Sequence, residues 1–305
     1  MKIIENQNNI ILKEVCDFSI SQTLECGQCF HFYNIGEDEY IVIAFNRMLH
    51  IKQVSDEIIF YNTCLKEYKE VWEHYFDLTN DYGAIKEYLT KRDATLIPAI
   101  EEKYGVHILN QEFSETLMSF IISQTKQIPQ IKQVVRTISE RFGEYVGEYE
   151  GTKYYAFPDI EKLKKITKEE FLECKAGFRA AYLVEAARFL TKEMNEDYFK
   201  NYSYDESKKI LTSIKGVGEK VANCVLLFSL GYRNAFPVDV WIKRTMEDMY
   251  FHKDTPKEII QRFGEERFGE YGGYAQQYLF FFGKTNLKND GAKDKLLKKD
   301  KKIKK

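Results

Sequence analysis

A short glycine turn followed by a lysine is the part of this sequence best suited to chemistry. Gly216-Val217-Gly218 predicts a tight hairpin turn, with Lys220 in the first turn of the next helix. Glycines allow a close backbone turn, and free amides at a helix start bind phosphate. The positive end of the helix dipole favours uncharged lysine, which is a nucleophile. Asp239 lies nineteen residues after Lys220, and a carboxylate stabilises a developing cation. The pattern indicates an amine that attacks a sugar of DNA.

The segment around this turn resembles the helix-hairpin-helix motif of DNA glycosylases. Its Gly-Val-Gly-x-Lys-Val-Ala-x-Cys pattern, with Pro-Val-Asp-Val downstream, is similar to the 8-oxoguanine DNA glycosylases. The resemblance extends from about Cys26 to Phe281. It implies that duplex DNA containing 8-oxoguanine is the partner, that Lys220 expels the flipped base through a Schiff base, and that β-elimination then cleaves the strand. Asp239 would stabilise the positive sugar, although aspartate is also a favoured helix N-cap.

The resemblance also implies residues that bind the flipped base. Cys224 follows Lys220 by one helical turn and would pack against one face of the base, although a buried structural thiol would look the same. Phe280 would close the other face, and Gln276 would bond the edge of the base; core packing is the alternative for Phe280. Gly27 would offer its carbonyl to the N7 proton that 8-oxoguanine carries and guanine lacks. For Gly27, a plain strand glycine is the alternative.

The residues expected to read the opposite base differ from those of animal and yeast relatives, which use an asparagine and two arginines. Thr125 or a neighbour in the segment 123–127 stands in place of the asparagine. Gln130 stands in place of the first arginine, and Arg179 matches the second. Phe178 matches the aromatic residue that wedges into the duplex. Glutamine lacks the charged planar fork of arginine, so we expect weaker insistence on cytosine opposite the lesion.

Three more expectations concern DNA and ions at the hairpin. Gly216 and Gly218 would present backbone amides to the phosphates. Trp241 replaces a histidine that contacts phosphate in the relatives, and it would either pack or stack. Similar hairpins bind a monovalent or calcium cation, for which the backbone carbonyls expected here are those of Thr212, Ile214 and Val217.

No cofactor is expected. The positions of the cysteines help to distinguish this function from those of related DNA glycosylases. Related glycosylases for oxidised pyrimidines or mispaired adenine often carry a four-cysteine iron–sulfur cluster near the C-terminus, but no cysteine follows Cys224. Cys26 and Cys29 form a lone Cys-x-x-Cys, which disfavours metal or redox chemistry. Glycosylases for alkylated bases usually lack the lysine. The alternatives that stay open are a glycosylase for another damaged base and a non-catalytic DNA-binding hairpin protein.

Composition indicates an ordinary soluble protein. Of 305 residues, 44% are hydrophobic and 30% are charged, with no apolar run of membrane-spanning length and no apolar signal-peptide core at the start. We therefore expect a cytoplasmic, nucleoid-associated monomer of bacterial or archaeal type. The net charge of −2 means that DNA must be held by a local patch or by backbone amides.

The order of the predicted elements indicates an α+β fold, with an antiparallel sheet first and helices after it. Residues 1–108 would form the sheet domain, residues 109–290 the helical domain with its hairpin at 208–230, and residues 291–305 a disordered, lysine-rich tail. The predicted strands are Gln28–Tyr33, Tyr40–Phe45, Met48–Lys52 and Glu57–Tyr61. Residues 143–158 are expected to form a loop, and Phe113–Gln124 the central buried helix.

Overall fold

The computed structural model describes the backbone of residues 1–303 and the side chains of residues 1–287. The chain forms two compact units. The first contains Met1–Asp81 and Gly105–Tyr232, and the second contains Tyr82–Tyr104 and Arg233–Lys305. This division differs from the predicted boundaries at residues 108 and 290, which stay predictions about domains. Within the described residues, helices of membrane-spanning length and apolarity are absent.

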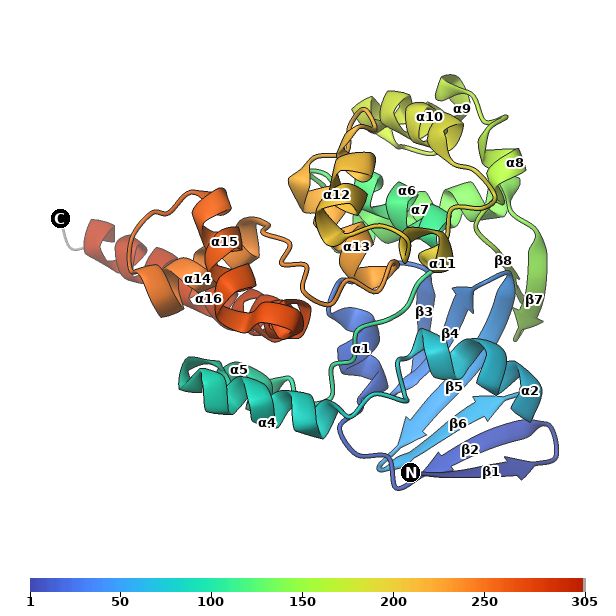
Figure 1. Cartoon of the computed structure of the whole chain (residues 1–305), viewed down its shortest axis with the longest axis horizontal. Helices are drawn as coiled ribbons and strands as arrows, with labels where there is room; N and C mark the ends of the chain where they lie inside the picture. Colours follow the sequence, from blue (N-terminus) through green and yellow to red (C-terminus); the bar gives the residue numbers. More distant parts are fainter. Residues whose placement is uncertain (304–305) are drawn as a thin grey trace. The chain divides into compact units, whose positions relative to one another are not determined.

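A six-stranded antiparallel sheet forms the N-terminal part of the first unit, in the order β1-β2-β6-β5-β4-β3 (Figure 1). Its strands are β1 (Lys2–Asn6), β2 (Asn9–Lys13), β3 (Phe32–Gly36), β4 (Glu39–Ala44), β5 (Arg47–Val54) and β6 (Glu57–Tyr61). This sheet and the helices that follow confirm the predicted α+β class. The hairpin β1–β2 was not predicted, and the strand expected from Gln28 begins only at Phe32.

The two faces of this sheet are covered differently. Alternate residues such as Ile10, Leu49 and Phe60 enter the main core, as the period of two in a strand requires. On the other face, Ile41 and Ile43 pack against Tyr154. Tyr154 belongs to a second hairpin, β7 (Tyr145–Tyr149) and β8 (Thr152–Tyr155). The prediction of a loop at 143–158 was therefore wrong, because apolar side chains in this segment find a partner on the sheet.

The rest of the first unit is helical. Its helices are α1 (Ile20–Glu25), α2 (Leu65–Glu67), α3 (Glu73–Tyr75), α6 (Phe113–Ile122), α7 (Ile128–Phe142), α8 (Ile160–Leu163), α9 (Lys168–Glu173), α10 (Ala180–Phe189), α11 (Glu196–Phe199), α12 (Tyr204–Thr212) and α13 (Glu219–Phe228). Every residue of α6 except Glu115 is buried, which confirms the predicted central helix.

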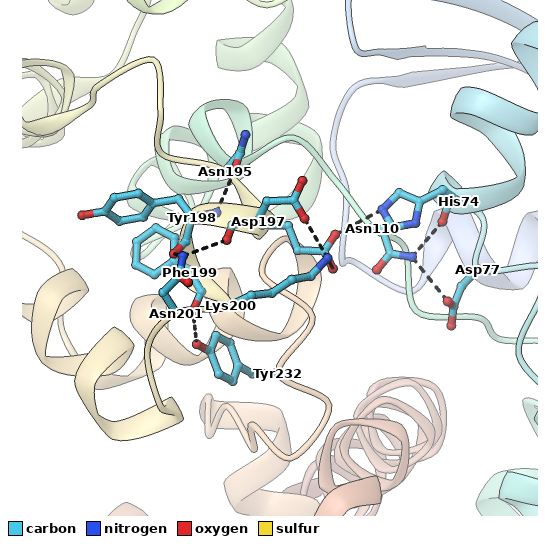
Figure 2. A network of polar contacts seen from close by, with 11 residues as sticks. His74, Asp77, Asn110, Asn195, Asp197, Tyr198, Phe199, Lys200, Asn201 and Tyr232 are labelled. Atoms are coloured by element: carbon cyan, nitrogen blue, oxygen red, sulfur yellow. Dashed lines mark hydrogen bonds and ion pairs between the residues drawn. The ribbon is translucent and has the colours of Figure 1, made fainter.

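A polar network joins the sheet part of the first unit to the helices near the hairpin (Figure 2). Glu196, at the start of α11, pairs with His74 at 3.2 Å. The backbone carbonyl of His74 accepts a hydrogen bond from Asn110 Nδ2 at 2.7 Å, and the same nitrogen lies 3.3 Å from Asp77 Oδ1. On the helical side, Tyr232 Oη lies 2.8 Å from the carbonyl of Phe199, the last residue of α11. Sheet and hairpin helices thus belong to one compact body.

The second unit is entirely helical in the residues that the structure describes. It contains α4 (Tyr82–Arg92), α5 (Ile97–Glu102), α14 (Val240–Met246), α15 (Lys257–Phe268) and α16 (Gly272–Ile303). Gly283 of α16 lies so close to Thr245 of α14 that an added Cβ would overlap the threonine hydroxyl. The backbone of α16 stays helical to Ile303, where a disordered tail was expected. Its alanine, leucine and lysine residues have good helix propensity.

An ion pair between an exposed arginine and a buried carboxylate stabilises the second unit. Asp93 is only 4% exposed, and its Oδ2 accepts a hydrogen bond from Arg267 Nε at 2.9 Å. Burial alone would raise the pKa of Asp93, but the bonds from Arg267 and Thr95 outweigh burial and lower it. Because the folded-state pKa is depressed, the ionised carboxylate stabilises the fold at neutral pH. That contribution is lost as the pH falls through the folded-state pKa.

We predict that Arg267→Met lowers the free energy of unfolding at pH 7 by about 1–3 kcal/mol, because a buried carboxylate loses its charged donor. Urea unfolding followed by circular dichroism measures the change. The same substitution in an Asp93→Asn background is the control, and its effect there should be much smaller. Equal losses in both backgrounds would show that Arg267 acts through packing and not through this ion pair.

Candidate functional site

The hairpin between α12 and α13 is fixed at Gly216. Its φ of +92° lies in the left-handed region that L side chains rarely adopt. A Cβ added there would lie 2.3 Å from the ring of Tyr182 on α10. Gln124 Nε2 donates to the Gly216 carbonyl at 3.0 Å. Gly218 has ordinary extended geometry and caps the N-terminus of α13, and the described residues leave open space where its Cβ would be. Gly216 is therefore required by its backbone conformation and by the packing of Tyr182, whereas Gly218 is the N-cap of α13 with no such packing constraint.

Lys220 lies in the first turn of α13, as predicted, and its side chain is half-buried. Its Nζ lies 3.4 Å from Ser123 Oγ and 4.9 Å from the centre of the Phe120 ring. Ser123 Oγ donates to the Phe120 carbonyl at 2.7 Å, so it can only accept a hydrogen bond from the lysine. The amine is thus held against the C-terminal end of α6.

Two of the residues expected at the flipped base lie in the same unit as Lys220. Cys224 is buried one turn along α13. Gly27 lies between α1 and β3 with a φ of +95°. The next residue, Gln28, is buried and bonds three backbone groups, the carbonyls of residues 23 and 107 and the amide of residue 109. Phe30 then meets the ring of Phe120 edge-on at 5.6 Å. Phe120 thereby contacts both the lysine and the Gly27 segment.

The residues expected at the opposite base have other contacts in this structure. Gln130 is exposed, and its Oε1 accepts a hydrogen bond from the Gln127 amide at the start of α7. Arg179 is 4% exposed, and its guanidinium is bonded inside the protein. Thr125 is exposed with a φ of +54°. Phe178 is 59% exposed, as a wedge residue must be.

The second unit holds the predicted carboxylate. Asp239 is the N-cap of α14, and its Oδ1 accepts a hydrogen bond from the Ile242 amide at 2.8 Å. Gln276 of α16 is buried and donates through Nε2 to the Pro237 carbonyl at 3.1 Å, which ties α16 to the segment that presents Asp239. Gln276 Oε1 is buried with no partner among the described residues. It is an acceptor that could receive a hydrogen bond from a ligand.

Phe280 and Trp241 complete the expected residues of the second unit. Phe280 is half-buried, one turn after Gln276 on α16. Trp241 is half-buried in the first turn of α14, and the guanidinium of Arg244 lies 5.5 Å from its ring. Trp241 therefore has a stacking partner within its own helix.

The hairpin carbonyls expected to bind a cation are partly engaged. The Ile214 carbonyl accepts a hydrogen bond from the Val217 amide at 3.0 Å. A carbonyl oxygen has a second lone pair, so this bond leaves room for a cation. In the part of the chain that the structure describes, no cluster of three His, Cys, Asp or Glu side chains suits a metal ion. Cation binding by Thr212, Ile214 and Val217 stays a prediction.

Several supporting residues were missed at the level of sequence. Phe120 and Ser123 contact Lys220, Gln124 bonds the hairpin, and Tyr182 packs against Gly216. The polar run Ser123-Gln124-Thr125 directly after an apolar helix was the available signal. The packing of Tyr182 against a glycine far away in the chain had no local signal.

Comparison with known proteins finds matches along most of the chain. The family model described as "8-oxoguanine DNA glycosylase, N-terminal domain" matches residues 10–117. The model described as "HhH-GPD superfamily base excision DNA repair protein" matches residues 118–269. The crystal structure of Clostridium acetobutylicum 8-oxoguanine glycosylase/lyase with dsDNA containing cytosine opposite to 8-oxoG is 40% identical. The match has a TM-score of 0.89 and covers 94% of this chain and 98% of that one.

Two further relatives are more distant. A probable N-glycosylase/DNA lyase of Methanothermobacter thermautotrophicus is 26% identical over 251 residues, which are 76% of this chain and 78% of the relative. The N-glycosylase/DNA lyase OGG1 of Arabidopsis thaliana is 27% identical over 282 residues, which are 87% of this chain and 77% of the relative.

We predict opposite outcomes for the two hairpin glycines. Gly216→Ala should lower the free energy of unfolding by about 2–4 kcal/mol, because it combines left-handed backbone strain with overlap on Tyr182. Gly218→Ala should cost about 1 kcal/mol or less, the difference between glycine and alanine as an N-cap. Thermal and urea unfolding measure both. Similar losses for the two variants would contradict the packing described at Gly216.

Proposed function

Because this chain belongs to the 8-oxoguanine DNA glycosylase/lyase family of the HhH-GPD superfamily, we propose that it excises 8-oxoguanine from duplex DNA and then cleaves the strand. The observation that carries the proposal is the placement of Lys220. It stands in the first turn of the hairpin's second helix, half-buried against Phe120 and Ser123. A phosphate-gripping lysine would instead be expected at an exposed position.

In the proposed mechanism Lys220 Nζ attacks C1′ of the flipped nucleotide. The C1′–N9 bond breaks and the base leaves with a proton, so that C1′ carries the lysine nitrogen and the ring oxygen O4′. The C1′–O4′ bond then breaks, O4′ takes up a proton, and the opened sugar is joined to the lysine as an imine. The imine acidifies C2′, so loss of a C2′ proton expels the 3′ phosphate by β-elimination. Asp239 would stabilise the cationic sugar while the base departs. Its Oδ1 is bonded to the Ile242 amide, which orients the carboxylate.

Recognition of the base is assigned to four residues. The Gly27 carbonyl would accept the N7 proton of 8-oxoguanine, and the bonded Gln28 supports the position of that carbonyl. Cys224 and Phe280 would each contact a face of the base, and Gln276 would bond its edge. The unpartnered Oε1 of Gln276 supports the last assignment, because a buried acceptor without a donor is unfavourable until a ligand supplies one.

The proposal extends to partners and location. Amides at Gly216 and Gly218 would hold a phosphate beside the hairpin, and a cation on the hairpin carbonyls would help to bind it. The chemistry requires no cofactor, since the amine is the nucleophile. We assign the protein to the cytoplasm and its nucleoid, acting as a monomer.

We predict that borohydride traps a covalent adduct between the native protein and duplex DNA containing 8-oxoguanine, and that Lys220→Gln abolishes it. Only an amine can form the reducible imine. Gel electrophoresis of a labelled duplex measures the adduct. A panel with 3-methyladenine and oxidised pyrimidines tests the alternative substrates. No adduct with any duplex would favour the non-catalytic DNA-binding alternative.

Asp239→Asn is the matched variant for this experiment. Asparagine caps a helix about as well as aspartate, so the fold of α14 should persist. We expect the rate of base excision to fall by about 10²-fold or more, because the carboxylate charge is lost where a cation develops. A variant that keeps the native rate would limit Asp239 to capping.

We also predict relaxed selection of the opposite base. Gln130 offers no charged fork, and it already bonds the backbone of its own helix. Excision rates measured for 8-oxoguanine opposite each of the four bases should differ by less than about a hundredfold, since the discrimination then rests on weaker contacts. A larger preference for cytosine would contradict this prediction.

A further inference from the structure

We propose that Gln111 is a positioning residue for the recognition of 8-oxoguanine, because it ties the segment that contains Gly27 to α13. This inference rests on the proposed function, in which the Gly27 carbonyl accepts the N7 proton of the base and α13 carries Lys220 and Cys224. The flipped base must then meet both the Gly27 carbonyl and α13 in one geometry. Gln111 forms hydrogen bonds to both of these parts of the protein.

Gly27 cannot fix the direction of its own carbonyl. Its φ of +95° lies in the left-handed region, and glycine has the widest choice of backbone conformations. The neighbouring residues supply the constraint. Cys26 Sγ and Gln28 Nε2 both donate to the carbonyl of Thr23 in α1, at 3.2 and 2.8 Å. The residues on either side of Gly27 are thus bonded to the same oxygen atom.

The buried side chain of Gln28 is held at both ends of its amide group. Its Nε2 also donates to the His107 carbonyl at 2.8 Å, and its Oε1 accepts a hydrogen bond from the Leu109 amide at 2.9 Å. The backbone carbonyl of Gln28 accepts a hydrogen bond from Gln111 Nε2 at 2.9 Å. Gln111 therefore holds the main chain directly after the peptide bond that joins Gly27 to Gln28.

The backbone of Gln111 is bonded to the C-terminal end of α13. Its amide donates to the carbonyl of Phe228, the last residue of α13, at 2.8 Å. Carbonyls in the last turn of a helix have no partner within the helix, so an external amide fixes this end. The Phe228 ring also stacks on the ring of Phe120 at 5.6 Å, and Phe120 lies beside Lys220. One residue thus bonds the Gly27 segment through its side chain and the helix of the nucleophile through its backbone.

Mutation can separate the two bonds of Gln111. Replacing its half-buried side chain removes the bond to the Gln28 carbonyl and leaves the backbone bond to Phe228. The Gly27 carbonyl should then lose its fixed direction, while Lys220 keeps its place. Excision of 8-oxoguanine needs both groups. Cleavage at a preformed abasic site needs no base recognition, because the lysine amine condenses with the C1′ aldehyde and releases water to form the imine.

The experiment compares Gln111→Met with the native chain on two duplexes, one with 8-oxoguanine opposite cytosine and one with a preformed abasic site. Gel electrophoresis after alkaline treatment measures base excision, and without that treatment it measures strand cleavage. Under single-turnover conditions we expect excision to slow by about tenfold and cleavage at the abasic site to stay within about twofold of native. Gln111→Glu keeps the shape but lacks the Nε2 donor. It should give the same result, and it replaces the first variant if that variant does not fold.

Gln261→Met is the matched control, since Gln261 is a glutamine of α15 whose side chain also donates one hydrogen bond, to Glu265 at 3.0 Å. Both of its rates should stay at native values. Equal losses in the two reactions would overturn the inference, because Gln111 would then act on the whole site. Native excision rates for the Gln111 variants would overturn it as well. Failure of the native chain to excise 8-oxoguanine would instead overturn the proposed function.

Discussion

The backbone conformation at Gly216 is the constraint on which the candidate site depends. The ring of Tyr182 leaves no space for a side chain there, and Gln124 bonds the carbonyl from another direction. Among the residues whose side chains are described, Lys220 contacts Ser123 at 3.4 Å and the ring of Phe120. Its direction must therefore come from the backbone that leads to it.

The N-terminal sheet contributes to the site through packing. The Gln28 side chain bonds the carbonyl of residue 23 and the amide of residue 109. The ring of Phe30 meets the ring of Phe120, which also lies beside Lys220. The Glu196–His74 pair connects the sheet part with the helices near the hairpin. The N-terminal part therefore contacts, through Phe30, the same Phe120 ring that lies beside Lys220.

Local patterns predicted the helices of the hairpin well. The glycine turn placed Lys220 in the first turn of α13, and the preference of aspartate for helix N-caps agrees with the position of Asp239 at the start of α14. The β7–β8 hairpin was missed because its tyrosines and glycines read as a loop until the sheet supplies a partner. The burial of Arg179 was also missed, because it depends on the Gln124 carbonyl and the Thr125 hydroxyl, more than fifty residues earlier in the chain, which no local pattern reveals. Its contact with DNA stays a prediction.

The unpartnered oxygen of Gln276 has a consequence for the protein without DNA. Gln276 Oε1 is buried with no partner among the described residues, and a buried acceptor without a donor costs about 1–3 kcal/mol. A ligand that donates an N–H group to this oxygen removes the cost of the unpaired acceptor. A ligand that presents only a lone pair leaves that cost in place and adds repulsion between the two acceptors. Selectivity for a hydrogen-bond donor is then already encoded in the resting protein before any nucleotide arrives.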